Sequence, residues 1–303
     1  MQQIKNDDKF KVGFFAIVGK PNAGKSSILN KILGQKVSIV SYKPQTTRNK
    51  IVGICTDDTS QLVFVDTPGF IQPDNMLNKF MEKQINLAIE GVDGIIFVLD
   101  CSKPASLKEL ESIEQLSKKG AVIVALNKVD LVDYQTVYPL IKQINELDCV
   151  TEIVSISALT GQNLDVLRQA CTSLCTESVK HYDDTQFTDR TERFMVGEIV
   201  REKILLYFQQ EIPHGVGVSI EKFEETKNIV KIGATIVCIK SSHKPILLGK
   251  DGLSIKKIGV EARKDIEDLL QKKVRLELFV KVRKNWKNNQ NYLSDIGYDK
   301  SEG

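Results

Sequence analysis

The feature that most constrains the fold is a glycine-rich motif near the amino terminus. Residues 19–26 read GKPNAGKS and fit the pattern GxxxxGK[ST], and they stand between an apolar segment at 14–18 and a helical pattern at 26–33. This context predicts a loop whose backbone N–H groups wrap phosphate oxygens, with the dipole of the following helix adding attraction. An ordinary glycine-rich turn is the alternative. The residues expected to contact the phosphates are Gly19, Lys20, Pro21, Asn22, Ala23, Gly24, Lys25, Ser26 and Ser27, with Lys25 on the β and γ oxygens and Ser26 on Mg²⁺.

Short apolar segments recur along the next 140 residues, at 62–65, 95–99, 121–126 and 153–156. Amphipathic stretches of helical period separate most of them, and this alternation predicts a largely parallel, doubly wound sheet. The segments 51–55 and 62–65 are joined by a short polar turn, so we expect one antiparallel hairpin in the sheet. The amino-terminal half is therefore predicted to be an α/β domain of about six strands.

A second phosphate-side loop follows the apolar segment at 62–65. It contains Asp66, Thr67, Pro68, Gly69 and Phe70. At a strand end, Asp66 can hold the magnesium shell and Gly69 can offer a backbone N–H to the γ-phosphate. The polar segment 35–50 contains the run QTTR, whose threonines can sense the γ-phosphate through the metal. We expect the magnesium site to be formed by Ser26, Thr47 and Asp66, with Thr46 as the alternative to Thr47.

Two further loops predict specificity for guanine. Asn127, Lys128, Val129 and Asp130 follow the segment at 121–126, and the Asp130 carboxylate can accept both N1–H and the 2-amino group of guanine. Adenine lacks that pair of donors. The residues after 153–156 offer backbone N–H groups to the guanine O6, and they are Ser157, Ala158 and Leu159. Four loops in this order predict a site for GTP and GDP.

The carboxy-terminal part differs in both charge and organisation. Residues 1–192 hold 21 Lys+Arg against 24 Asp+Glu, whereas 193–303 hold 21 against 15, so the basic excess lies in the second half. The order expected there is a helix, two strands, a turn, a helix and a strand, which is a small α+β unit. We expect a polar linker at 179–192, the α+β domain at 193–285, and a polar tail at 286–303 that is mobile unless something binds it.

The turn at 249–252 has the GxxG form of a KH domain, whose glycines let a nucleic-acid backbone approach closely. Basic residues surround the turn, and Trp286 lies among further lysines as an aromatic side chain expected to be available for stacking on a base. A solvated charged face is the alternative. The partner of such a groove is single-stranded RNA. The residues expected to bind it are Gly249, Lys250, Asp251, Gly252, Lys256, Lys257, Lys284 and Trp286.

The motifs GKPNAGKS, QTTR, DTPGF, NKVD and SALTG resemble those of the Era family, within the translation-factor GTPase superfamily. The resemblance extends over nearly the whole chain. It implies an α/β P-loop GTPase domain at 1–178, with a mostly parallel, doubly wound six-stranded sheet, followed by a small α+β KH type-2 domain. It also implies Mg²⁺-dependent hydrolysis of GTP to GDP and phosphate. The implied partners are the 3′ end of 16S rRNA and the 30S ribosomal subunit, whose assembly and maturation such proteins serve.

The resemblance also implies that some of these proteins associate peripherally with the bacterial cell membrane. No segment of this sequence approaches the 18 to 20 apolar residues, roughly, that a membrane span requires, and the amino terminus has no apolar signal core. We therefore expect a cytoplasmic protein, and a monomer.

One residue departs from the better-known signalling GTPases. Phe70 stands where those proteins place a water-orienting glutamine, and its ring cannot orient a water by hydrogen bonding. Superfamily members with asparagine at the position of Asn22 use K⁺ there in place of an arginine finger. The resemblance thus implies a catalytic role for Asn22 beside Lys25 and Thr47, with a simple turn role for Asn22 as the alternative. There are two competing functional hypotheses. In one, the chain is a binding module whose GTPase fold serves as a slow structural clamp. In the other, it is a GTPase that acts in tRNA modification or secretion.

Overall fold

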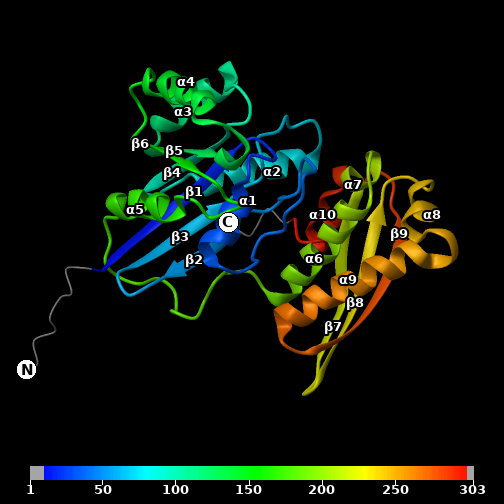
Figure 1. The fold of residues 1–303 in the computed structure, drawn as a ribbon. Helices are drawn as coiled ribbons and strands as arrows, with labels where there is room; N and C mark the ends of the chain where they lie inside the picture. Colours follow the sequence, from blue (N-terminus) through cyan, green and yellow to red (C-terminus); the bar gives the residue numbers. More distant parts are fainter. Residues whose placement is uncertain (1–9, 299–303) are drawn as a thin grey trace, which may run out of the picture. The chain divides into compact units, whose positions relative to one another are not determined.

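The computed structural model describes residues 10–298, and these residues form two compact units (Figure 1). The first unit comprises the chain up to Ser38, together with Thr47–Ile71 and Lys83–Asp189. The second comprises Ile39–Thr46, Gln72–Glu82 and the chain from Arg190 onward. Two short segments of the amino-terminal half therefore group with the carboxy-terminal unit.

The first unit is built on a six-stranded sheet with the strand order β2-β3-β1-β4-β5-β6. Its strands are β1 (Lys11–Gly19), β2 (Ile51–Thr56), β3 (Ser60–Asp66), β4 (Gly94–Asp100), β5 (Ala121–Asn127) and β6 (Glu152–Ile156). All neighbours pair in parallel except β2 and β3, which form the expected antiparallel hairpin. The predicted mostly parallel sheet is confirmed. Interior strands such as β5 are near-continuous apolar runs because both of their faces are buried.

Helices cover both faces of this sheet, and the alternation of side chains along β1 shows how. The side chains of Ala16 and Val18 pack with apolar residues of three helices on one face of the sheet. Gly13 and the Phe15 ring lie on the opposite face, near the carboxyl end of a fourth helix. The first face carries α2 (Met76–Ala88), α3 (Leu107–Ser117) and α4 (Tyr134–Asn145), and the second carries α1 (Lys25–Leu33) and α5 (Leu164–Leu174).

Strand β1 is the point at which the topology changes direction. It pairs with β3 on one side and with β4 on the other, so successive strands are added on opposite sides of it. Open α/β sheets bind ligands at the carboxyl edge of such a switch point. The glycine-rich loop begins at this edge, directly after β1.

The polar segment after α5 is held along the first unit. The Val12 N–H donates to the Glu177 carbonyl at 2.8 Å, and the Ile54 N–H donates to the Phe187 carbonyl at 2.9 Å. Between these points, the fully buried Gln61 side chain donates to the Tyr182 carbonyl. The stretch predicted as a linker at 179–192 is exposed or half-buried throughout, and up to Asp189 it groups with the first unit and is hydrogen-bonded along it. The segment after α5 satisfies backbone groups of β1 and of the edge strand β2.

The second unit has a three-stranded sheet with the order β7-β8-β9, in which β7 and β8 are antiparallel and β8 and β9 parallel. Its elements are α6 (Glu192–Tyr207), α7 (Glu211–His214), β7 (Val216–Glu225), β8 (Ile229–Cys238), α8 (His243–Leu248), α9 (Leu253–Leu270), β9 (Lys273–Val282) and α10 (Gln290–Asp295). Short 3₁₀ turns lie at Lys250–Gly252 and Trp286–Asn288. Ile258, Ala262 and Ile266 of α9 are buried together with residues of α6, and they form part of the core of this unit.

The described part of the tail is folded, contrary to the expectation of a mobile segment. Trp286 is 1% exposed, and Leu293 and Tyr298 are buried as well. The Trp286 ring and Ile296 lie against Gly217 on β7, where an added Cβ would approach Ile296 Cδ1 to 3.1 Å. Scattered apolar residues in a polar stretch were enough to attach the tail to the sheet. The remaining tail residues of that prediction lie outside the described residues.

Candidate nucleotide site and nucleic-acid surface

The glycine-rich loop needs glycine at two positions because of its backbone and its neighbours. Gly19 has φ 146° and Gly24 has φ 105°, both in the region that favours glycine. A Cβ on Gly19 would lie 2.5 Å from the Val98 carbonyl oxygen, and one on Gly24 would overlap the Asn127 amide. The loop therefore lies tightly between β4 and the loop after β5. This packing brings the expected phosphate-binding and base-binding residues together.

Lys25 is the buried cation of the loop. Its side chain is 6% exposed, and Nζ donates to the carbonyls of Gly19 at 3.0 Å and Lys20 at 2.9 Å. Burial lowers the pKa of Lys25 from 10.5 to about 8, and the nearby Asp66 carboxylate opposes part of that shift. A buried ammonium held by two carbonyl oxygens is suited to accept the negative charge of a phosphate.

The residues expected to hold magnesium lie side by side. Ser26 Oγ is 2.9 Å from Thr47 Oγ1 and donates to Asp66 Oδ2 at 2.5 Å. Asp66 is fully buried, and its other oxygen, Oδ1, has no hydrogen-bond partner among the described residues. Burial raises the pKa of the Asp66 carboxyl, and the hydrogen bond from Ser26 and the charge of Lys25 oppose this rise. Two hydroxyls and a buried carboxylate with a free oxygen form an oxygen donor set that fits Mg²⁺.

The geometry also separates the two candidate threonines. Thr47 is 6% exposed and directs its hydroxyl to Ser26, whereas the Thr46 hydroxyl donates to the Lys43 carbonyl at 2.7 Å. Thr47 is therefore the threonine that stands with the other predicted metal ligands.

Asn127 connects the loops on the base side of the site. Its Nδ2 donates to the Ala23 carbonyl at 2.8 Å, and its Oδ1 accepts the Ala158 N–H at 2.9 Å. Ser157 Oγ in turn donates to Asp130 Oδ1 at 2.5 Å. The two predicted guanine loops thus lie together with the phosphate loop. One expected base donor, the Ala158 N–H, is bonded to Asn127 here.

The loop after β3 lies against the phosphate loop. The Phe70 N–H donates to the Gly19 carbonyl at 3.3 Å, and a Cβ on Gly69 would lie 2.6 Å from the Pro21 nitrogen. The Thr67 hydroxyl donates to the Ile17 carbonyl at 2.7 Å. The Phe70 ring stacks on Phe97 at 6.1 Å between centroids, so it belongs to the apolar packing of the sheet.

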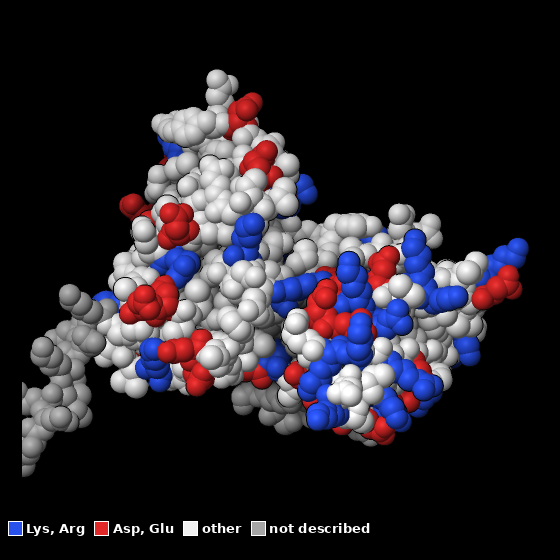
Figure 2. Space-filling model, turned by 60° about the horizontal axis from the view of Figure 1, so that its bottom comes forward, with Lys and Arg blue, Asp and Glu red and all other residues white. Residues whose placement is uncertain are grey.

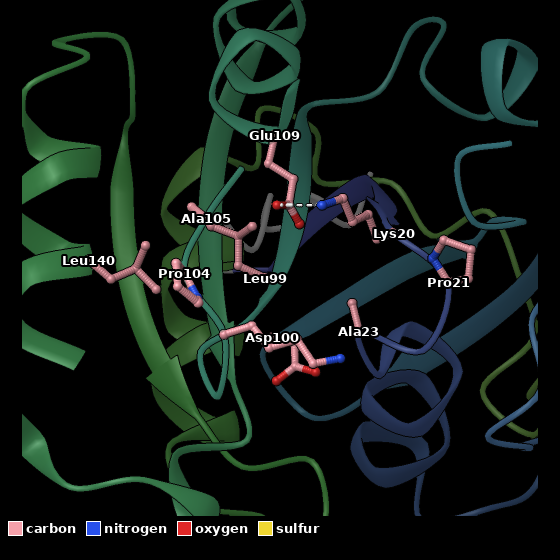
Figure 3. A pocket seen from close by; sticks show the side chains of 10 residues that line it. Lys20, Pro21, Ala23, Leu99, Asp100, Pro104, Ala105, Glu109 and Leu140 are labelled. Atoms are coloured by element: carbon pink, nitrogen blue, oxygen red, sulfur yellow. Dashed lines mark hydrogen bonds and ion pairs between the residues drawn. The ribbon is translucent and has the colours of Figure 1, made fainter. Parts of the chain in front are cut away.

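A small cavity of about 110 Å³ lies beside the phosphate loop (Figure 3). Lys20 lines it, pairing through Nζ with Glu109 Oε2 at 2.8 Å and donating to Ser106 Oγ at 2.8 Å. Lys128, expected to contact nucleotide, pairs with Asp100 Oδ2 at 2.6 Å at the end of β4. The sequence interpretation did not include these partners. The Ser-x-x-Glu spacing at 106–109 is a capping-box signature that could have located the start of α3, and the structure shows that box complete.

The GxxG turn has the backbone that the KH interpretation requires. Gly249 and Gly252 both have φ 74°, and Asp251 between them has φ 51°. A Cβ on Gly249 would overlap Ser254 at the start of α9. Lys250, Lys256 and Lys257 are exposed around this turn. Figure 2 shows Lys and Arg side chains gathered over the carboxy-terminal unit, with acidic residues among them. An exposed basic surface therefore surrounds a turn that a polyanion backbone can approach.

Trp286 does not belong to this surface, so the expectation that it is available for stacking is wrong. Its ring is 1% exposed and its Nε1 donates to the Gly215 carbonyl at 3.1 Å. An aromatic ring with a satisfied N–H and no exposed face acts in packing. Lys284, close to it in sequence, is exposed.

Comparisons with known proteins agree with both halves of this description. Residues 14–128 match the family model of the 50S ribosome-binding GTPases, and residues 211–287 match that of the KH domain. The GTPase Era of Clostridioides difficile is 45% identical over 294 residues, which cover 96% of this chain and 99% of that protein. The chain belongs to the Era family of GTPases. The GTPase Era of Clostridium botulinum strain Okra is 44% identical over 96% of this chain and 99% of its own length.

Two solved Era structures share the whole architecture. One is a crystal structure of Era in complex with MgGDPNP and nucleotides 1506–1542 of 16S ribosomal RNA, with a TM-score of 0.92, 36% identity and coverage of 96% of this chain and 99% of that one. The other is a variant of Aquifex aeolicus Era bound to GDP·AlF₄⁻, also at TM-score 0.92 and 36% identity, covering 96% and 100%. The predicted Era-type GTPase fold with a KH domain is confirmed. This member of the Era family is thus an enzyme that hydrolyses GTP.

Proposed function

We propose that this Era-family GTPase binds Mg²⁺ with GTP at the four loops and uses its KH unit to bind single-stranded RNA near the 3′ end of 16S rRNA, in the assembly and maturation of the 30S subunit. The observation that carries the proposal is the match over 96% of the chain to an Era solved with both MgGDPNP and a 16S rRNA segment. In this chain, the four loops supply the groups that would bind the nucleotide and Mg²⁺, and the GxxG turn with its exposed lysines supplies the groups that would bind RNA.

Guanine selection rests on Asp130. Its carboxylate is oriented by the Ser157 hydroxyl and can accept two N–H groups from guanine. Asn127 joins the phosphate loop to the loop at 157–159, so a bound base meets a surface that is already assembled. This arrangement favours GTP and GDP over adenine nucleotides.

We assign the phosphate side to residues whose side chains lie close to one another. Lys25 would neutralise the β and γ oxygens. Ser26, Thr47 and Asp66 would hold the magnesium, because the Ser26 hydroxyl lies within hydrogen-bonding distance of both other side chains. The metal, when bound, neutralises the charge that develops on the phosphates. Phe70 packs on Phe97 and supplies no hydrogen bond to an attacking water through its side chain.

We also propose that K⁺ accelerates hydrolysis through Asn22. Asn22 is exposed at the tip of the phosphate loop with φ 64°, so a ligand ion can reach it. The same φ is one that asparagine tolerates in turns, which is what the alternative role requires. Turnover measured in KCl and in NaCl at equal ionic strength decides between them. Faster turnover in KCl that is lost in Asn22→Ala supports the ion, and equal rates in the two salts contradict it.

The RNA proposal is tested with an oligonucleotide from the 3′ end of 16S rRNA and one of scrambled sequence. We expect the exposed pair Lys256→Glu with Lys257→Glu to weaken binding and to lower its salt dependence, because phosphate contacts release counterions. Undiminished binding by this variant contradicts the proposed surface. Crosslinking followed by RNA sequencing identifies the cellular partner, and enrichment of tRNA over 16S rRNA would point to the competing pathway.

None of the helices within residues 10–298 is both long and apolar enough to cross a bilayer. Peripheral association with the cell membrane and a monomeric state stay predictions. Co-sedimentation with lipid vesicles and sedimentation velocity are the corresponding measurements.

A further inference from the structure

A short segment after α1 is fixed to that helix by one side chain. Asn30 Oδ1 accepts the N–H groups of Val37 at 3.0 Å and Ser38 at 2.9 Å, and Asn30 Nδ2 donates to the Ser38 carbonyl at 2.6 Å. Val37 and Ser38 are buried, so their backbone groups need such partners. Asn30 thus determines where the Ser38 side chain lies relative to the helix that carries Ser26.

The Ser38 hydroxyl reaches the proposed magnesium site. Ser38 is 1% exposed, and its Oγ donates to Asp66 Oδ2 at 2.8 Å. The same oxygen accepts the Ser26 hydroxyl at 2.5 Å. Both serine hydroxyls therefore lie on Oδ2, and Oδ1 is the oxygen of Asp66 that has no hydrogen-bond partner among the described residues.

We infer that Ser38, held by Asn30, is a positioning residue for magnesium binding. Its hydroxyl orients the Asp66 carboxylate and leaves Oδ1 for the metal or a water bound to it. A buried carboxylate with two donors on one oxygen has a restricted side-chain torsion, and this preorganises the oxygen that faces the ion. The inference rests on the proposed magnesium site formed by Ser26, Thr47 and Asp66.

The expected effect is on metal affinity. Hydrogen-bond partners behind metal ligands typically change metal affinity by about 10- to 100-fold when removed. We expect the lower end for Ser38→Ala, because Ser26 continues to donate to Asp66. Asn30→Ala should act in the same direction, since it releases the main chain of Ser38 without touching Asp66.

The test measures release of a fluorescent GDP analogue from the full-length protein across a range of free Mg²⁺. Ser38→Ala should raise the Mg²⁺ concentration at half-maximal retention by about tenfold, and leave the release rate in excess EDTA unchanged. Ser41→Ala is the matched control, because the Ser41 hydroxyl accepts the Lys43 N–H and makes no bond to Asp66. It should behave as wild type in both conditions.

An unchanged Mg²⁺ midpoint in Ser38→Ala overturns the inference, and so does an equal acceleration of release with and without Mg²⁺, which a loss of general packing would cause. If Ser38→Ala does not fold, Asn30→Ala carries the same test, and an unchanged midpoint there overturns it. A wild-type protein whose nucleotide release ignores Mg²⁺ would instead refute the proposed magnesium site itself.

Discussion

Replacing Asn127 by alanine tests whether the base side of the nucleotide site is assembled before a nucleotide arrives. Asn127 is 2% exposed, and its amide bonds the Ala23 carbonyl and the Ala158 N–H. Alanine removes both bonds and leaves two main-chain groups without their partner. Each unsatisfied buried group costs about 1–3 kcal/mol, so the pair costs about 2–6 kcal/mol. We expect about 2 kcal/mol, because a water can occupy the space of the lost amide and bond both groups.

Two measurements on the nucleotide-free protein check this value. A loss of about 2 kcal/mol should lower the thermal midpoint of a unit of this size by about 4–8 °C. The affinity for a fluorescent GDP analogue should fall at least about tenfold, since the loops are no longer held in place for the base. Asn145→Ala, at an exposed position at the end of α4, should change neither quantity. An Asn127→Ala protein with wild-type midpoint and wild-type affinity would refute the reasoning.

Three further predictions concern single side chains. Asp130→Asn should shift preference from guanine toward xanthine nucleotides, and unchanged GTP affinity in a competition assay would exclude Asp130 as the base-reading residue. The pKa of Lys25 falls from 10.5 to about 8 on folding. Between pH 8 and 10.5 the unfolded chain therefore binds more protons than the folded one, so the free energy of unfolding should rise with pH over this range, by up to about 3 kcal/mol. The free energy of unfolding is measured from pH 8 to 10.5, without nucleotide, for wild type and for Lys25→Met. The difference between the two proteins isolates this effect, and two pH curves that stay parallel contradict it. Trp286→Ala should destabilise the second unit by about 3–5 kcal/mol in chemical denaturation, as for other buried aromatics, whereas a direct RNA contact would lower RNA affinity at wild-type stability.

The nucleotide loops could be predicted from the sequence because each is local. A phosphate loop needs glycines and a lysine at set spacings between a strand and a helix, and these are consecutive residues. The parallel sheet then brings the ends of β1, β3, β5 and β6 to one edge, whatever the details of packing. The same holds for the GxxG turn, whose positive φ angles are a property of the four residues themselves.

The roles of isolated residues could not be predicted in this way. Trp286 stands among lysines in the sequence, which suggested an RNA contact, but its indole N–H bonds the carbonyl of Gly215, 71 residues away. Gln61 and Tyr182 meet at a separation of 121 residues, and this contact holds the predicted linker. The Ser38 hydroxyl lies on Asp66 because Asn30 positions its main chain, and no spacing rule relates these three positions.

The sequence by itself therefore determined the chemistry: a guanine nucleotide site made from four loops, and a KH-type turn with exposed basic residues. Only the tertiary structure decided which polar and aromatic side chains are buried, and hence which of them act in packing, in holding Asp66 or at the surface. The physical reason is that a motif is satisfied by neighbours along the chain, whereas burial depends on partners that are brought together only when the sheet and its helices have packed.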